Sequence, residues 1–306
     1  MKMLKRASLL TAALAVTAPA SLALAQQADP LPETYSGVRA TGMGNALTPI
    51  AAGVDSLYHN PAGLARGEMY ILDGAFTYTP QGGLLSAGIA DSKTNPQIAA
   101  GVSYSYYFGA EDHADLSGHD VRAAAAVPVI PERISLGVGG RYMHYTDSSL
   151  PEDPDNEDSQ VLFKGFTVDV GAMFRVTEFL HLGINGQNLI DPCRNDARCR
   201  GAAPTRIGGG FGLGTVSTFH LTGQAFVDIS SAEDPLFDFG VGAEYVAAGA
   251  IPLRLGFERQ GFFERNLITA GFGWRSQAAG LDLSYRHDLN QSSSFGYISG
   301  GFSVYF

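Results

Sequence analysis

Residues 151–158 form a strongly acidic stretch of the sequence that would suit calcium binding. Asp153, Asp155 and Glu157 alternate in it, as the ligands of a calcium-binding loop do. The central glycine of such a loop is missing, however, and Lys164 stands where a bidentate glutamate is needed. A solvated surface loop is the simpler interpretation, with weak calcium binding as the alternative. We predict no dedicated metal site.

Motifs for nucleotide binding and for hydrolysis are incomplete. Gly42-x-Gly44 lacks the third glycine of a dinucleotide loop, since Leu47 takes its place and no strand precedes it. The nucleophile motif Gly-x-Ser-x-Gly does not occur. Asp282 and Arg286 belong to a charged cluster that we interpret as an ion-pair network; a lipid hydrolase, recognisable only by geometry, is a minor alternative. We predict no catalytic residue, no cofactor and no enzymatic activity.

The two cysteines, Cys193 and Cys199, lie six positions apart in a polar segment. In an exported protein, such a pair is most simply a local disulfide. A metal site would need further ligands nearby, and none stands at a suitable spacing.

The first 25 residues have the pattern of a cleaved signal peptide. Three basic residues precede the apolar run 7–24, which ends in the A-x-A sequence 23–25. Removing the three positive charges changes the formal net charge from −10 to −13, which argues against a nucleic-acid partner because phosphate binding needs clustered Lys and Arg. After this segment, no apolar run approaches the roughly 18 residues of a membrane helix.

Fourteen stretches with alternating hydrophobicity follow, separated by turn residues. We predict strands at 69–80, 82–91, 97–109, 119–128, 132–146, 161–175, 178–189, 205–214, 217–229, 235–246, 251–259, 267–275, 279–288 and 297–306. The number is even, as in bacterial single-chain membrane barrels. Apart from the first pair, the segments between the predicted strands are alternately long and short. This alternation also favours a barrel with surface loops at one end and periplasmic turns at the other.

One face of each predicted strand is apolar, and the other carries glycines together with charges of both signs. In residues 253–258, Leu253, Leu255 and Phe257 share a face opposite Arg254 and Glu258. Apolar residues outward and charges inward suit a barrel surrounded by lipid better than a filled core. The predicted lumenal charges are Asp169, Glu244, Arg254, Asp282 and Arg286. The fold class predicted is all-β: a transmembrane antiparallel barrel of about 14 strands with an N-terminal lumenal hatch.

Aromatic residues gather near the predicted outer ends of the strands and at the C-terminus. The outer groups include residues 104–108, Tyr142 with Tyr145, and Phe262 with Phe263. A girdle at the membrane interface is the default interpretation, and a groove for a hydrophobic ligand is the alternative. The chain ends in Phe306 on an apolar face, which resembles the signal by which outer-membrane barrels reach their assembly machinery.

The stretch 35–66 differs from everything after it. It is rich in glycine and alanine, lacks alternation, and ends in the turn-forming sequence Asn60-Pro61-Ala62-Gly63-Leu64. A short helix is predicted within residues 45–58. Irregular backbone is tolerated at membrane depth only where protein shields it from lipid. We therefore predict that this stretch is a plug inside the barrel.

The same stretch carries a family resemblance, in residues 42–46 and in 55–64 with its Asn-Pro-Ala-Gly-Leu sequence. It resembles the start of the outer-membrane long-chain fatty acid transporter superfamily (FadL/TodX-like). Three later stretches, 164–172, 182–189 and 241–245, resemble its shorter, PorV-like members.

The resemblance implies a fourteen-stranded barrel with a lumenal hatch, whose expected residues are Gly42, Gly44, Asn60, Pro61, Ala62 and Gly63. In the transporter branch, hydrophobic ligands enter from outside and leave through a gap in the wall. In the PorV-like branch, the barrel serves protein secretion or surface attachment.

Three regions are therefore predicted: signal peptide 1–25, periplasmic N-terminus and hatch 26–66, and barrel 67–306. The expected location is the outer membrane. The first hypothesis is transport or binding of hydrophobic compounds such as long-chain fatty acids. The second is a structural or secretion-associated barrel with protein partners. Expected contacts in either case are the lipid bilayer and the barrel assembly machinery.

Overall fold

The structure is a computed structural model and describes residues 34–153, 158–194, 199–290 and 296–306. The predicted signal peptide lies outside these residues. The short helices are α1 (Val38–Thr41), η1 (Gly53–Asp55), α2 (Ser56–His59), η2 (Pro61–Ala65) and η3 (Glu111–His113). None of the helices in these described ranges is long and apolar enough to cross a membrane.

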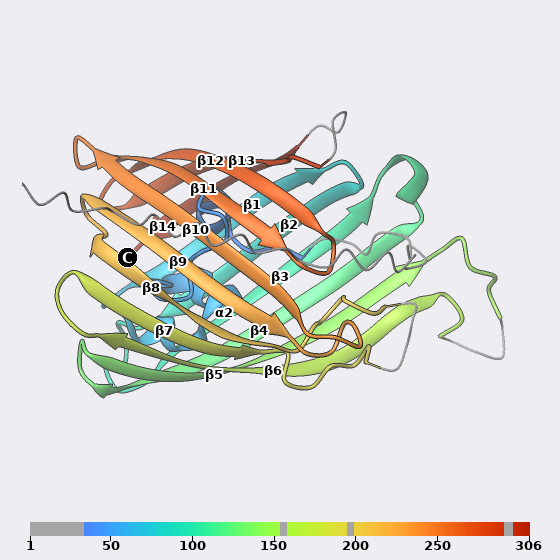
Figure 1. Cartoon of the computed structure of the whole chain (residues 1–306), viewed down its shortest axis with the longest axis horizontal. Coiled ribbons are helices and arrows are strands. Elements are labelled where there is room, and N and C mark those ends of the chain that lie inside the picture. The colour runs from blue at the N-terminus through green and yellow to red at the C-terminus, as the bar shows by residue number, and fades with distance from the viewer. Residues whose placement is uncertain (1–33, 154–157, 195–198, 291–295) are drawn as a thin grey trace, which may run out of the picture. The chain divides into compact units, whose positions relative to one another are not determined.

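Fourteen strands form one closed antiparallel barrel, in which each strand pairs with its sequence neighbours and β1 pairs with β14 (Figure 1). The strands are β1 (Tyr70–Thr79), β2 (Gly82–Asp91), β3 (Ala99–Gly109), β4 (Leu116–Ile130), β5 (Ile134–Asp147), β6 (Val161–Arg175), β7 (Leu180–Gln187), β8 (Arg206–Thr215), β9 (Phe219–Asp228), β10 (Leu236–Ala247), β11 (Ile251–Gln260), β12 (Arg265–Arg275), β13 (Ala279–Asp288) and β14 (Tyr297–Tyr305). The predicted fold class and strand number are confirmed.

Side chains alternate across the wall as the sequence pattern predicts. On β11, Leu255 is 68% exposed on the outer surface, whereas its neighbour Arg254 is 2% exposed and faces inward. A lipid-facing apolar surface around a polar interior is the arrangement of transmembrane barrels. The aromatic girdle is only partly as predicted. Tyr104 and Tyr142 face outward, but Tyr107 and Tyr145 are buried inside the barrel, because they occupy the inward parity of their strands.

The two ends of the barrel differ in the length of their connections. Segments 80–81, 110–115, 148–160, 188–205, 229–235, 261–264 and 289–296 join strands at one end, and 92–98, 131–133, 176–179, 216–218, 248–250 and 276–278 at the other. Apart from the first pair, 80–81 and 92–98, the connections at the first end are the longer ones. Outer-membrane barrels have longer loops on the cell surface, so we call the first the outer end. Strands β3 to β6 are the longest neighbouring set, because β4 and β6 reach 15 residues.

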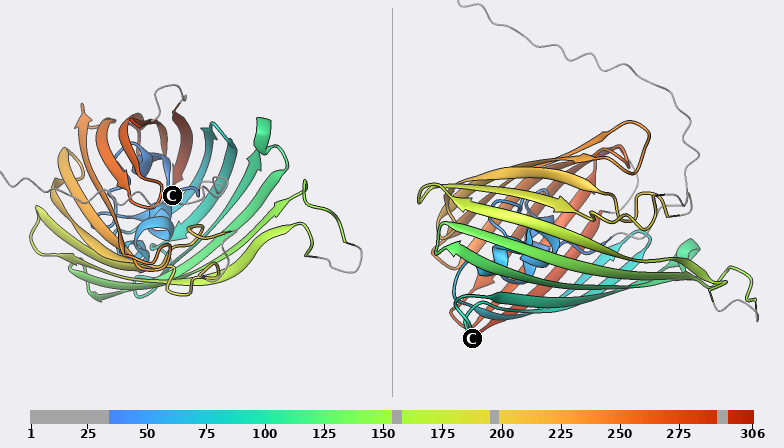
Figure 2. Two further views of the ribbon diagram at one scale, coloured as in Figure 1. Left: turned by 45° about the vertical axis from the view of Figure 1, so that its right-hand side comes forward. Right: turned by 90° about the horizontal axis from the view of Figure 1, so that it is seen from below.

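Residues 34–66 lie inside the barrel, where Figure 2 shows their short blue helices surrounded by strands. We call them the internal segment. Its α-helices among the described residues are the four-residue α1 and α2. Within residues 45–58, where a short helix is predicted, helical structure begins only at Gly53, with η1 followed by α2. Backbone turns precede it, with the amide N–H of Ile50 donating to the carbonyl of Leu47.

Lumen-facing glycines form a belt around the internal segment. On ten of the fourteen strands, a Cβ added at such a glycine would contact this segment. The belt consists of Gly88, Gly101, Gly137, Gly171, Gly183, Gly212, Gly240, Gly242, Gly256, Gly271 and Gly301. At Gly242, for example, the Cβ would collide with the carbonyl oxygen of Met43. The wall therefore fits its contents at backbone distance, which only glycine permits.

Candidate functional site

Asn60 fastens the internal segment to the wall between β6 and β7. Its side chain is fully buried, and its Nδ2 lies 3.3 Å from the carbonyl oxygens of both Ala172 and Ile184. Its Oδ1 accepts from the amide N–H of Ala62 at 3.1 Å. These two strands share the shortest ladder of the barrel, with six residue pairs from Val170 to Arg175. Asn60 therefore adds polar contacts where strand pairing is least extensive.

The other predicted hatch residues also lie against the wall or within the segment. Pro61 and Ala62 cover Gly137, where a Cβ would collide with their backbone. The amide N–H of Gly44 donates to the Thr269 hydroxyl at 3.0 Å. Gly63 packs inside the segment, where a Cβ added to it would lie 2.5 Å from the carbonyl oxygen of Ala51.

A buried ion-pair network ties the segment to the lower wall, which is the end with short turns. Arg39 contacts Glu244 at 3.2 Å, and Glu244 also pairs with Arg254 at 2.5 Å. Arg254 in turn contacts Asp282 at 2.5 Å. Three of the five predicted lumenal charges thus meet in one network. Each buried charge has a partner, as burial without large desolvation cost requires.

The remaining two predicted charges lie apart from this network. Asp169 accepts the backbone N–H of Asn188 at 2.6 Å, where β7 ends. Arg286 pairs with Glu258 at 3.7 Å and covers the ring of Tyr297 at 4.2 Å. Both side chains are buried on the inner face of their strands, but their heights along the barrel separate them from Glu244.

A cavity of about 180 Å³ lies above the internal segment, toward the outer end; we call it the chamber. Aromatic and basic side chains line it together. They include Tyr35, Tyr58, Phe226, Phe262, Arg122 and Arg206. The described part of the segment begins here, since Thr34, Tyr35 and Ser36 are also lining residues.

The floor of the chamber is ordered by rings and buried polar groups. Tyr35 and Tyr58 meet edge to face at 5.1 Å, and the Arg122 guanidinium lies 4.9 Å from the Tyr58 ring. His59 Nε2 donates to the Ser36 carbonyl at 2.7 Å. Burial lowers the pKa of His59 to about 4, so its imidazole is neutral at physiological pH.

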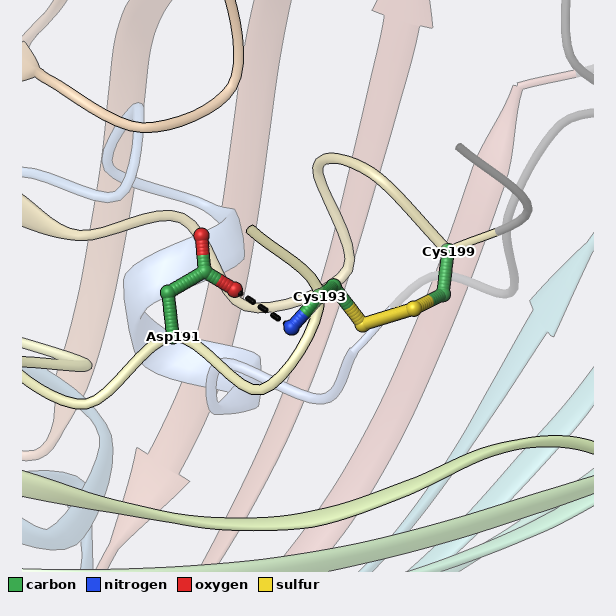
Figure 3. The surroundings of a disulfide bond; sticks show 3 residues. All are labelled: Asp191, Cys193 and Cys199. Atoms are coloured by element: carbon green, nitrogen blue, oxygen red, sulfur yellow. Dashed lines mark hydrogen bonds between the residues drawn. A yellow bond between two sulfur atoms is a disulfide. The ribbon is translucent and has the colours of Figure 1, made fainter. Parts of the chain in front are cut away.

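The loop that carries the disulfide forms part of the chamber wall and roof. Cys193 and Cys199 are bonded, and the Cys193 amide donates to Asp191 Oδ1 at 2.8 Å (Figure 3). Both cysteines are buried in an apolar cluster with lumen-facing side chains of β2 to β6. That cluster includes Leu84, Tyr107, Met143, Tyr145 and Phe163. The disulfide is therefore a packing element of the barrel mouth, and Gly201 and Ala202 beside it line the chamber.

The structure places several residues behind the metal-site and hydrolase alternatives that the sequence left open. No group of three or more His, Cys, Asp or Glu there is arranged to hold a metal. Asp155 and Glu157 lie outside those residues. Lys164 pairs with Asp158 at 2.5 Å on an exposed surface. His287 contacts the outward-facing Tyr285, on the opposite face from the lumenal carboxylates of its strand.

Arg39 is a lumenal residue that the sequence pattern did not single out. Its signal was its charge within a glycine-rich stretch already predicted to lie inside the barrel. A charge in such a place needs an opposite partner. The partner, Glu244, lies 205 positions away, so the sequence could indicate the need for a carboxylate without identifying it.

Comparisons with known proteins place the fold. No protein-family model and no curated protein sequence matches the chain. Solved structures do match. The CymD monoaromatic hydrocarbon channel is 12% identical, with a TM-score of 0.60, over 87% of this chain and 98% of that one. A FadL homologue of Pseudomonas aeruginosa is 12% identical, with a TM-score of 0.56, over 90% of this chain and 97% of that one. The toluene transporter TodX of P. putida is 9% identical, with a TM-score of 0.55, over 87% of this chain and 95% of that one.

Proposed function

We propose that this FadL/TodX-like barrel resides in the outer membrane, binds a small hydrophobic or amphipathic compound at its outer side, and passes it inward. The chamber carries the proposal, because aromatic rings and guanidinium groups line it together on the outer side of the internal segment. Rings such as Tyr58 offer apolar contact, and Arg122 or Arg206 offers a partner to one polar or anionic group. The hydrocarbon channels that share the fold support the same class of ligand.

The volume of the chamber limits the ligand. About 180 Å³ is close to the ~150 Å³ of an engineered cavity that holds benzene. It is below the roughly 300–1,000 Å³ of pockets for drug-sized molecules. A single aromatic ring or a short chain therefore fits. A long-chain fatty acid would require the chamber to widen.

Equilibrium titration of the purified protein with toluene, benzoate and oleate tests this proposal. We expect saturable binding of the two single-ring compounds. Ala202→Phe places a ring in the chamber wall and should abolish that binding, whereas Ala232→Phe, at an exposed position of another outer loop, should leave it intact. Absence of binding by both rings, or equal binding in both variants, would contradict the proposal.

A second candidate is a closed barrel that presents its loops to a protein partner. The network around Glu244 and Arg254 favours it, since these buried ion pairs close the lower lumen beside the internal segment. Affinity capture of the full chain from a detergent extract separates the two functions. A stoichiometric protein partner together with no ligand binding supports the second, and ligand binding with no such partner supports the first.

A further inference from the structure

Arg66 ends the internal segment at the short-turn end of the barrel, which we call the inner end. It follows η2 and lies four positions before β1. Its Nη1 donates to the carbonyl oxygen of Pro49 at 3.0 Å, and its Nη2 lies 3.0 Å from Nδ1 of His181. Within the described ranges, no Asp or Glu oxygen lies within 4 Å of its guanidinium. Its positive charge is therefore held by a carbonyl and an imidazole, without a carboxylate.

Other arginines of the lumen are paired differently. Eight of them in the described part of the chain have a carboxylate oxygen within 4 Å: Arg39, Arg122, Arg141, Arg206, Arg254, Arg265, Arg275 and Arg286. Such pairing offsets the cost of placing a charge in low-dielectric surroundings. Burial and the nearby charge of Arg175 lower the pKa of Arg66 to about 10, so it is still protonated at pH 7. This charge lacks the counter-charge that the others have.

Two further basic side chains lie beside Arg66. His181, the second residue of β7, is 5% exposed, and Arg175 stands directly across the β6–β7 ladder from it. Cross-strand neighbours of this kind have Cβ atoms about 4.5–5.5 Å apart. Arginine only donates, so Nδ1 of His181 accepts from Arg66 and the ring proton is on Nε2. In the part of the chain that the structure describes, this Nε2–H has no acceptor.

The carboxylate nearest this group in the ion-pair pattern is that of Glu132. It lies 3.7 Å from Arg175, and its side chain is 84% exposed. An ion pair so open to water contributes little, and a stronger ligand can replace it. The three basic side chains therefore gather donors and positive charge without a strong counter-charge.

We propose that Arg66, His181 and Arg175 form a binding site for a small oxyanion, a carboxylate or a phosphate, at the inner end. Two guanidinium groups and one Nε2–H supply the charge and the directed donors that such groups bind. His181 lies on the inner face of β7, and Arg66 belongs to the internal segment, so the anion approaches from the lumen or the periplasm. The site is at the opposite end of the barrel from the chamber and does not depend on the proposed uptake.

Titration of the purified full chain with inorganic phosphate at constant ionic strength tests the site. The signal is the imidazole nitrogen resonance of His181 in protein labelled with nitrogen-15 at histidine, identified by its absence from His181→Gln. We expect a saturable shift in the wild type. Arg66→Gln removes one guanidinium but keeps an amide donor for Pro49, and it should lower the affinity at least about tenfold. The matched control is Lys93→Gln, which removes the same charge from an exposed inner turn between β2 and β3 and should bind as the wild type does.

Glu132→Gln tests the same site in the opposite direction. It removes the carboxylate that competes for Arg175, so phosphate should bind about twofold to fivefold more tightly, as expected for the loss of an exposed ion pair. A purely structural role of Arg66 predicts no such gain. A parallel titration with acetate shows which oxyanion the site prefers, and saturable binding of either one supports the proposal.

The source of the anion is tested by repeating the titration in phosphatidylglycerol nanodiscs. We expect unchanged affinity, because the site faces away from the lipid; loss of binding there would overturn its lumenal placement. Folding of each variant is checked by heat-dependent migration in gels. The site itself is refuted if neither phosphate nor acetate gives a saturable shift. Wild-type affinity in folded Arg66→Gln, an equal loss in Lys93→Gln, or no gain in Glu132→Gln would refute it as well.

Discussion

Replacing Asn60 should weaken the barrel by an amount that the structure sets. The Nδ2 group has two hydrogens and faces three carbonyl oxygens at 3.2–3.3 Å, while Oδ1 accepts one bond. Two donated bonds and one accepted bond, at about 1 kcal/mol each, predict a loss of about 3 kcal/mol in unfolding free energy for Asn60→Ala. Asn60→Asp should cost more, because a buried carboxylate would face carbonyl oxygens and donate nothing.

The measurement is urea unfolding in phospholipid vesicles, followed by fluorescence of the single tryptophan, Trp274, on the lipid-facing surface. Asn266→Ala is the control, because its amide bonds the exposed Asn290 side chain and its loss should change stability by no more than about 0.5 kcal/mol. An Asn60→Ala protein as stable as the wild type would refute the argument, since the donated and accepted bonds would then contribute nothing.

Three further predictions concern the segment, its charge and the mouth. Gly171→Ala, whose Cβ would collide with the Asn60 amide oxygen, should cost about 1–3 kcal/mol; Gly300→Ala, whose nearest neighbour is 3.6 Å away, should be neutral in the same assay. Burial raises the pKa of Asp55 from 3.8 to about 6, so its ionisation costs about 3 kcal/mol as pH rises through this range. Unfolding should therefore show Asp55→Asn to be stabilising at pH 8 and not at pH 4, and an equal effect at both would contradict this. Replacing both cysteines by serine should lower stability by about 2 kcal/mol, and unchanged thermal unfolding would show that the disulfide contributes nothing.

The wall could be predicted from the sequence because its signal is local. Alternation such as Leu253, Arg254, Leu255 depends only on neighbouring positions and on which side meets lipid. The girdle prediction is wrong for Tyr107 and Tyr145, because it rests on proximity to a strand end and not on the parity of the position. Parity alone would have placed both inside.

The path of the internal segment could not be predicted beyond its place in the lumen. Its turns are set by contacts with residues far away in sequence, such as Gly44 with Thr269 and Asn60 with Ile184. The Asn-Pro-Ala-Gly-Leu sequence indicated a turn, but not which strands it would meet. Contact partners of this kind depend on barrel closure, which no local pattern contains.

A wall fitted so closely to its contents restricts the order in which the molecule can be assembled. The segment precedes β1 in the chain. Belt glycines on ten strands surround it so closely that an added Cβ would contact it. Threading it into a finished ring would require those strands to separate again. We infer that it is enclosed while the sheet is still open, and that the pairing of β1 with β14 is the final step of biogenesis.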